Sequence, residues 1–145
     1  MNAIDEQRCK ELLVILRKMI QAVDLYSKHL NKQWGLTGPQ LVILKEVAVS
    51  QEISVSELAR TISLSQGTVT DIINRLEGKG LIHKKKSPGD RRRVMISPSE
   101  QCIDILKDAP PPLEEKFTKA FIDLEEWEQL MILSSMNRLV GIMTT

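Results

Sequence analysis

The sequence predicts a mainly α-helical fold that carries one small β-hairpin. Apolar residues recur at helical spacing through most of the 145-residue chain. The spacing changes between the glycines near residue 80 and Ser97, where two short strand-like runs flank the turn Ser87-Pro88-Gly89-Asp90. Pro and Gly at the centre of that turn favour type II geometry, with a positive φ at Gly89. Because aromatic residues make up only 3% of the chain, aliphatic side chains and Met must form the core.

The first predicted helix runs from about Glu6 to Trp34 and ends at Gly35. It contains no Gly or Pro, and its apolar residues follow helical spacing. Residues 12–16 are five consecutive apolar residues, so the apolar arc is wider than one buried face needs. A helix of this kind has to be covered by more than one neighbour.

Three short helices are predicted next. Thr37 is a candidate N-cap of the first of them. Ser54 and Glu57 form a capping-box pattern at the start of the second. Residues 63–66 separate the second of these helices from the third, which is predicted at about 66–78. The glycines at 78 and 80 end the third helix.

The C-terminal part is also predicted to be helical. Ser99 leads into a helix that the prolines at 110–112 interrupt, and residues 113–124 and 126–143 then return to helical spacing. These helices carry more apolar surface than a chain of this length can bury against its own first helix. We therefore expect two copies to pack through their terminal helices about a two-fold axis. A monomeric bundle with a larger core is the alternative.

Charge is unevenly distributed along the chain. The formal net charge is +1, yet residues 75–93 carry eight basic and two acidic side chains, a net of +6. Residues 98–145 carry nine acidic and four basic side chains, a net of −5. A local cationic excess of this size indicates a polyanion as partner. A solvated basic surface strip is the alternative.

The three short helices and the basic hairpin form, in this order, a winged helix-turn-helix. Two helices joined by a short turn meet steeply, so one crosses the DNA backbone while the other enters the major groove. We call the helix at about 66–78 the recognition helix and the hairpin at 81–97 the wing, which is expected at the adjacent backbone or minor groove. The candidate DNA-binding residues are Ser65, Gln66, Thr68, Thr70, Asp71, Asn74, Arg75, Lys84, Lys86, Arg91, Arg92 and Arg93.

The predicted organisation has three parts within one compact structural unit per chain. Residues 1–34 form an N-terminal dimerisation helix, 36–98 the winged helix-turn-helix lobe that binds DNA, and 99–145 the C-terminal dimerisation helices. The fold class is therefore mainly α with a small β-hairpin wing, a winged helix-turn-helix flanked by N- and C-terminal dimerisation helices.

Five motifs also carry a resemblance to a known family. They are LTGPQL at 36–41, LARTI at 58–62, SQGTVT at 65–70, RLEGKGL at 75–81 and Asp90-Arg91-Arg92 in the wing. These motifs resemble those of the MarR (multiple antibiotic resistance regulator) transcription factors. The resemblance implies an obligate homodimer on a pseudo-palindromic operator in double-stranded DNA. Asp71 departs from the family, because many members carry a basic or neutral residue there, and a carboxylate repels phosphate.

The same resemblance implies roles for single residues and a mode of regulation. Arg92 is expected to enter the minor groove, and Asp90 to stabilise the wing by pairing with a neighbouring Arg. Members are typically repressors released by small phenolic or other aromatic ligands, or by thiol oxidation. We expect a ligand pocket between the DNA-binding lobe and the dimerisation helices, although ordinary core packing also explains its residues. Its expected lining is Met19, Val23, Tyr26, Trp34 and Val42.

Two further functions remain open on the sequence. Cys9 lies roughly where the peroxide-sensing relatives carry their reactive thiol, so a thiol-based redox-sensing regulator is one alternative. The other is a winged-helix protein-interaction module that does not bind DNA. Cys102 is expected to be a small core residue.

No enzyme, cofactor or metal site is expected. The chain lacks a phosphate-cradling glycine loop, a nucleophile elbow and an acid–base constellation. His29 and His83 are too far apart in the sequence, and too poorly accompanied by Cys or Asp, to propose a zinc site. Without a membrane span or a secretory signal, and with only two thiols, the chain is expected in the cytoplasm.

Overall fold

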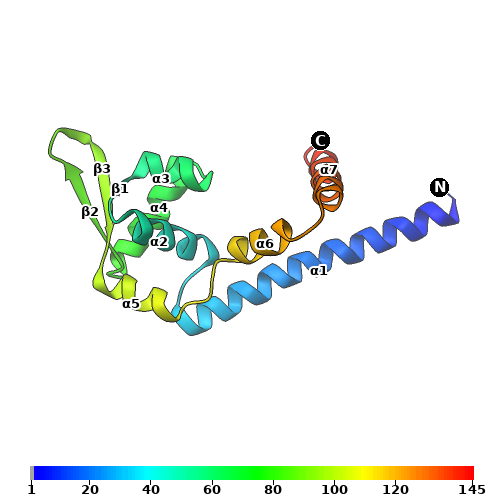
Figure 1. Ribbon diagram of the computed structural model, residues 1–145, viewed down its shortest axis with the longest axis horizontal. Helices are drawn as coiled ribbons and strands as arrows, with labels where there is room; N and C mark the ends of the chain where they lie inside the picture. The colour runs from blue at the N-terminus through cyan, green and yellow to red at the C-terminus, as the bar shows by residue number, and fades with distance from the viewer. Residues whose placement is uncertain (1) are drawn as a thin grey trace. The chain divides into compact units, whose positions relative to one another are not determined.

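The computed structural model describes residues 2–145 and divides the chain into two units, Met1–Pro110 and Pro111–Thr145. Figure 1 shows the elements in chain order. The first unit contains α1 (Ala3–Trp34), α2 (Gly38–Ser50), β1 (Ile53–Ser54), α3 (Val55–Ile62), α4 (Gln66–Gly78), β2 (Ile82–Ser87), β3 (Asp90–Pro98) and α5 (Glu100–Asp108). The second contains α6 (Leu113–Ile122) and α7 (Glu126–Met143). The predicted fold class, mainly helical with a small wing, is confirmed.

The long helix α1 extends three residues further toward the N-terminus than the sequence predicted. Asn2 is its N-cap, and the Asn2 side chain accepts a hydrogen bond from the Asp5 amide over 2.8 Å. The first turn is exposed, so it has no apolar residue pattern to mark the start. Gly35 ends the helix in the left-handed region, at φ 66°. Only Gly adopts this region without a steric penalty, which explains the sharp end at the predicted position.

The N-caps of α2 and α3 are the predicted residues, Thr37 and Ser54. Thr37 caps α2 in a full capping box: its hydroxyl accepts from the Gln40 amide, and the Gln40 side chain accepts from the Thr37 amide. Ser54 accepts from the Glu57 amide over 3.2 Å, as predicted. The capping box predicted at Ser54 is wrong in its second half, however. The Glu57 carboxylate binds Arg93 of β3 instead of the N-cap backbone.

The wing belongs to a three-stranded antiparallel sheet with the strand order β1-β3-β2. The sequence predicted only the two-stranded hairpin, β2 and β3. The additional strand β1 is two residues long, and it pairs Ile53 with Ile96 and Ser54 with Met95. A strand this short has no measurable alternation of apolar and polar residues, so the sequence could not show it. β1 joins the base of the wing to the start of α3.

The type II turn predicted at the wing tip is wrong. Ser87 pairs with Asp90, which leaves Pro88 and Gly89 as the loop, and the positive-φ glycines are Gly35 and Gly80 rather than Gly89. Pro88 cannot adopt the positive φ of the primed hairpin turns. The register shifts between Lys86 and Ser87, and the tip closes without a left-handed Gly89.

The hydrophobic core of the first unit lies between α2, α3, α4 and the base of the wing. Ser99 fastens α5 to this core: its hydroxyl donates to the Gly80 carbonyl over 2.8 Å and accepts from the Cys102 amide. The buried apolar residues are Leu30, Leu36, Leu41, Ile43, Leu44, Val47, Ile53, Leu58, Ala59, Val69, Ile73, Leu76, Leu81, Ile82, Ile96 and Cys102.

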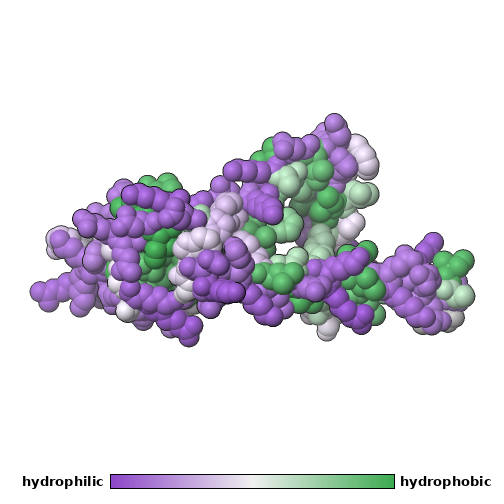
Figure 2. Space-filling model, turned by 90° about the horizontal axis from the view of Figure 1, so that it is seen from below, coloured by the Kyte–Doolittle hydropathy of each residue, from purple (hydrophilic) through white to green (hydrophobic). Residues whose placement is uncertain are grey.

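Much apolar surface lies outside this core. Figure 2 shows hydrophobic side chains on the exposed surface of α1. In the second unit, Phe117 and Trp127 are each 64% exposed, and α6 and α7 have no buried residue. The exposed large apolar residues of α1 are Ile4, Leu12, Leu13, Val14, Ile15, Met19, Ile20, Val23 and Leu25. Exposed apolar side chains in such number are typical of an interaction site.

Candidate nucleic-acid interface

The turn between α3 and α4 is short and closed by side chains and backbone. α3 ends at Ser63, which lies in the left-handed region at φ 57° and ψ 41°. The Leu64 amide donates to the Ala59 carbonyl over 3.1 Å, which closes the end of α3. Ser65 then caps α4 by accepting from the Thr68 amide, and the Ser65 and Thr68 hydroxyls are 2.8 Å apart. Ser65 and Thr68, two of the predicted DNA-binding residues, are therefore part of the helix cap, and both are exposed.

The recognition helix α4 has one buried and one exposed face. Val69, Ile73 and Leu76 are at most 1% exposed. The other face is open, and the predicted residues on it are all exposed: Gln66, Thr68, Thr70, Asp71, Asn74 and Arg75. This face carries amide, hydroxyl, carboxylate and guanidinium groups, which are the groups that hydrogen-bond to base edges and phosphates.

The wing presents its cations on an exposed hairpin. Lys84, Lys86 and the three arginines at 91–93 are exposed. Asp90 Oδ1 accepts a hydrogen bond from the backbone amide of Arg92 over 2.9 Å. The carboxylate of Asp90 thus acts within the turn, on the main chain of Arg92 rather than on a guanidinium. This bond holds the backbone at the residue that the family resemblance places in the minor groove.

Two of the basic wing residues have partners on the helices. Lys84 donates to Asn74 Oδ1 over 2.6 Å and lies 3.5 Å from the Glu77 carboxylate. Arg93 forms an ion pair with Glu57 of α3. One strand of the wing is therefore connected to α4 and the other to α3 by side chains.

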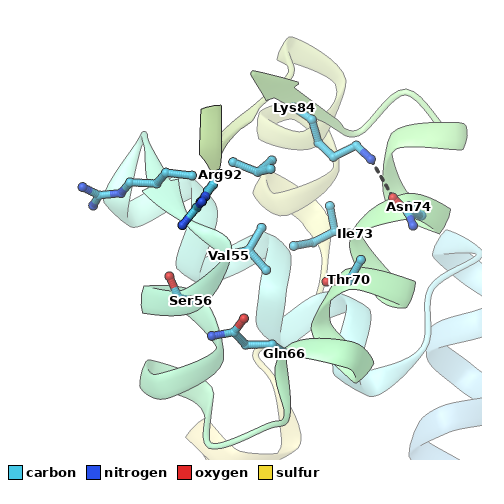
Figure 3. Close-up of a pocket in the computed structure, with 10 residues that line it drawn as sticks. Val55, Ser56, Gln66, Thr70, Ile73, Asn74, Lys84 and Arg92 are labelled. Carbon is cyan, nitrogen blue, oxygen red and sulfur yellow. Dashed lines mark hydrogen bonds between the residues drawn. The ribbon is translucent and has the colours of Figure 1, made fainter. Parts of the chain in front are cut away.

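A cleft of about 250 Å³ lies between the wing, α3 and α4. Figure 3 shows Gln66 and Thr70 on α4, Val55 and Ser56 on α3, and the hydrogen bond between Lys84 and Asn74. The ten lining residues are Val55, Ser56, Gln66, Thr70, Ile73, Asn74, Lys84, Arg92, Arg93 and Val94. Six of them are among the predicted DNA-binding residues, so the cleft brings the recognition helix and the wing together at one surface.

Two tertiary contacts near this surface could not be predicted from the sequence. One is the ion pair of Glu57, whose position in a capping-box pattern suggested a local partner. The other is Lys79, whose ammonium donates to the Gly35 carbonyl and lies 3.5 Å from Gln40 Oε1. Lys79 thereby connects the end of the recognition helix to the junction of α1 and α2. Each contact joins residues that are far apart in the sequence, so no local pattern indicates it.

The residues predicted to line a ligand pocket lie on α1 and α2. Met19 and Val23 are exposed on α1, and Val42 is half-buried on α2. Tyr26 and Trp34 are half-buried and pack against the core. The Trp34 ring also makes an edge contact with His29, with ring centroids 5.9 Å apart. Their role in ligand binding stays a prediction.

The two cysteines differ in environment. Cys9 is exposed on α1, whereas Cys102 is buried at the start of α5. Burial raises the pKa of the Cys102 thiol, because the thiolate would lose its hydration. Among residues 2–145, no group of three or more His, Cys, Asp and Glu side chains could hold a metal ion. Within the same residues, no helix has the length and hydrophobicity required to cross a membrane.

Comparison with known proteins accounts for this arrangement. The model of the MarR family matches residues 36–94, which run from the start of α2 into the second strand of the wing. The lobe that carries the recognition helix and the wing is therefore similar to the MarR family. The HTH-type transcriptional regulator YcgE of Bacillus subtilis (strain 168), itself described as uncharacterized, is 28% identical over 134 residues, which cover 92% of this chain and 87% of YcgE.

Two further similar proteins cover most of the chain. The HTH-type transcriptional regulator MhqR of Bacillus subtilis (strain 168) is 25% identical over 137 residues, 94% of this chain and 93% of MhqR. The crystal structure of the S. aureus MepR–DNA complex covers 89% of this chain and 96% of the MepR chain, with a TM-score of 0.66 and 18% identity. At that identity, the similarity to MepR shows the winged-helix fold alone.

Proposed function

We propose that this chain is a homodimeric, sequence-specific DNA-binding transcriptional regulator of the MarR family. The recognition helix α4 enters the major groove, and the wing lies against the adjacent backbone with Arg92 in the minor groove. The observation that carries the proposal is the shared cleft: the exposed polar face of α4 and the basic wing border it together. In a DNA duplex, the base edges of a groove are flanked by the phosphates of the backbone, so one protein surface can contact both.

The dimer is supported by the apolar surface of the helices outside the DNA-binding lobe. Exposed Leu, Ile, Val and Met side chains follow α1, and further ones follow α7. A second copy of the chain provides an equivalent apolar surface, and a two-fold dimer buries both. Two recognition helices related by a two-fold axis are suited to an operator with inverted half-sites about one helical turn apart.

The mode of regulation in this proposal is repression that a small aromatic effector relieves. The effector would lie near Tyr26 and Trp34, whose half-buried side chains pack against the core. Binding there would change the separation of the two recognition helices and so lower the affinity for the operator. The proposed partner, genomic DNA, implies a cytoplasmic location.

Selection of bound sequences from a random DNA pool tests the proposal. We expect an inverted repeat whose half-sites are centred about 10 base pairs apart, bound by two chains. We also expect the affinity to fall steeply with salt, because phosphate contacts release counterions. Panels of aromatic acids are then tested for release of the selected duplex. Failure to retain any duplex, even at low salt, would support the protein-interaction module instead.

A further inference from the structure

The ion pair between Glu57 and Arg93 joins the wing to the first turn of α3. The Arg93 guanidinium donates to the Glu57 carboxylate, and the two side chains are 48% and 43% exposed. Glu57 follows three residues after Ser54, the last residue of β1. The pair therefore connects the wing to the helix that precedes the recognition helix, across 36 residues of sequence.

The position of Arg93 along β3 gives the pair its significance. The backbone pairing of β1 with β3 ends at Ser54 and Met95. Among the described residues, β3 pairs only with β2 toward the tip, and the register shifts between the pair Lys86–Val94 and the pair Ser87–Asp90. A two-stranded hairpin is only marginally stable by itself. Arg93 lies two residues beyond Met95, so the ion pair continues the attachment of β3 to the lobe where the backbone pairing stops.

The pair also borders the cleft beside the recognition helix. Arg92 and Arg93 both line the cleft, and the backbone of Arg92 is held by Asp90. A change in the direction of β3 at Arg93 would move Arg92 relative to α4. The carboxylate of Glu57 also neutralises part of the charge that Arg93 would otherwise offer to a phosphate.

We propose that Glu57 and Arg93 form a positioning pair that sets the wing relative to the recognition helix for DNA binding. The inference rests on the proposed DNA-binding function. Arg93 acts through Glu57 rather than on DNA, whereas Arg91 and Arg92 remain available for the duplex. Exposed ion pairs contribute little to the stability of a fold, so the effect is expected in DNA affinity and not in the melting temperature.

Charge reversal in a double-mutant cycle tests the pair directly. Full-length Arg93→Glu, Glu57→Arg and the double variant are titrated with the duplex recovered by selection, with fluorescence anisotropy as the readout. We expect Arg93→Glu to weaken binding about tenfold or more. Adding Glu57→Arg should restore affinity to within about threefold of the wild type, because the pair is rebuilt with its charges exchanged. Glu57→Arg alone should weaken binding.

Arg91→Glu is the matched control, because Arg91 neighbours the pair and has no carboxylate partner within residues 2–145. Adding Glu57→Arg to Arg91→Glu should change the DNA affinity by no more than Glu57→Arg changes the affinity of the wild type. If Glu57→Arg changes the affinity of the wild type and of Arg93→Glu by the same factor, the two side chains act independently, through the net charge near the DNA. That outcome overturns the proposal. Wild-type binding in the same assay tests the DNA-binding function separately, so the two failures are distinguishable.

The salt dependence of binding gives a second, independent readout. If a charge-reversed variant does not melt cooperatively, the neutral variants Arg93→Gln and Glu57→Gln replace it in the double-mutant cycle. Arg93→Gln should weaken binding with an unchanged slope of log Kd against log salt, whereas Arg91→Gln should lower the slope by about 1. A slope lowered by about 1 in Arg93→Gln would identify Arg93 as a direct phosphate contact and contradict the proposal.

Discussion

Lys84 of the wing donates a hydrogen bond to the amide oxygen of Asn74 on the recognition helix, over 2.6 Å. An ammonium group has only donors, so the oxygen of Asn74 must face Lys84 and its NH₂ group faces away. Lys84 thus uses one of the two lone pairs of that oxygen, and Asn74 keeps its NH₂ donors and one acceptor lone pair for the bidentate pairing with adenine. The Glu77 carboxylate, 3.5 Å from Lys84, neutralises part of the same charge.

Lys84 and Lys86 are consequently expected to differ, although the sequence made them equivalent. Lys86→Met should lower the slope of log Kd against log salt by about 1, because it removes a solvent-exposed cation from the wing. Lys84→Met should lower the slope by less, because Asn74 and Glu77 already hold its charge. Salt titrations of the two variants check this expectation. Equal losses of slope would show that Lys84 leaves its partners when DNA binds.

Arg92→Ala should weaken DNA binding by about 1–3 kcal/mol and leave the fold and the dimer unchanged. The side chain lines the cleft, while its backbone amide is bonded to Asp90 and survives the substitution. Gel-shift titration measures the affinity, and circular dichroism with sedimentation checks the fold and the dimer. Wild-type affinity in a folded variant would rule out the role of Arg92 at the DNA.

Ser63 should be sensitive to the shape of the replacing side chain. It lies in the left-handed region at φ 57°, where β-branched residues are strained. Ser63→Val should lower the free energy of unfolding by about 1–2 kcal/mol, whereas Ser63→Gly should be tolerated. Urea denaturation of both variants provides the measurement. A valine variant as stable as the glycine variant would contradict the strained geometry of the helix-turn-helix.

An acidic residue on the apolar face of α7 should weaken the proposed dimer. Leu130 is 59% exposed in the single chain, so Leu130→Glu places no charge in the core of that chain. In a dimer, the same charge would be buried without a partner, which is strongly unfavourable. Sedimentation at several concentrations should show dissociation, with Arg138→Gln as the control on the same helix. Dimers of undiminished affinity would exclude this face from the interface.

The two thiols should react very differently. Burial raises the pKa of the Cys102 thiol above the ordinary value of 9.0, so the thiol stays protonated at higher pH. The contribution of the buried thiol to stability is therefore complete below pH 9.0 and is lost as the pH rises through the raised pKa. At pH 8, a thiol reagent should modify Cys9 at once and Cys102 only after denaturation.

Peroxide should release DNA through Cys9 only under the redox-sensing alternative. Release that persists in Cys9→Ser would exclude that alternative.

Local signals in the sequence predicted most of the helices and their caps. The N-caps Thr37 and Ser54, the end of α1 at Gly35 and the break at the prolines all appear where short-range chemistry places them. Glu57 shows where such reasoning ends, because its side chain has two possible partners. The local one completes a capping box, and the distant one, Arg93, becomes available only after the sheet has formed.

The residues of the candidate interface could also be predicted only in part. The polar face of α4 follows from helical spacing, because Val69, Ile73 and Leu76 must turn inward together. The partners of Lys84 and Lys79 depend on how the wing and the junction at Gly35 pack against α4. The strand β1 is similarly defined by its partner, since two residues have no periodicity. Sequence spacing thus indicates which residues are exposed, and tertiary packing decides which of them remain free for DNA.

Hydroxyl-radical footprinting of the selected duplex tests the central claim most directly. Two wings and two recognition helices should protect two patches on one face of the DNA, about 10 base pairs apart from centre to centre. Arg92→Ala should remove the minor-groove part of each patch. A single protected patch, bound by one chain, would contradict the account.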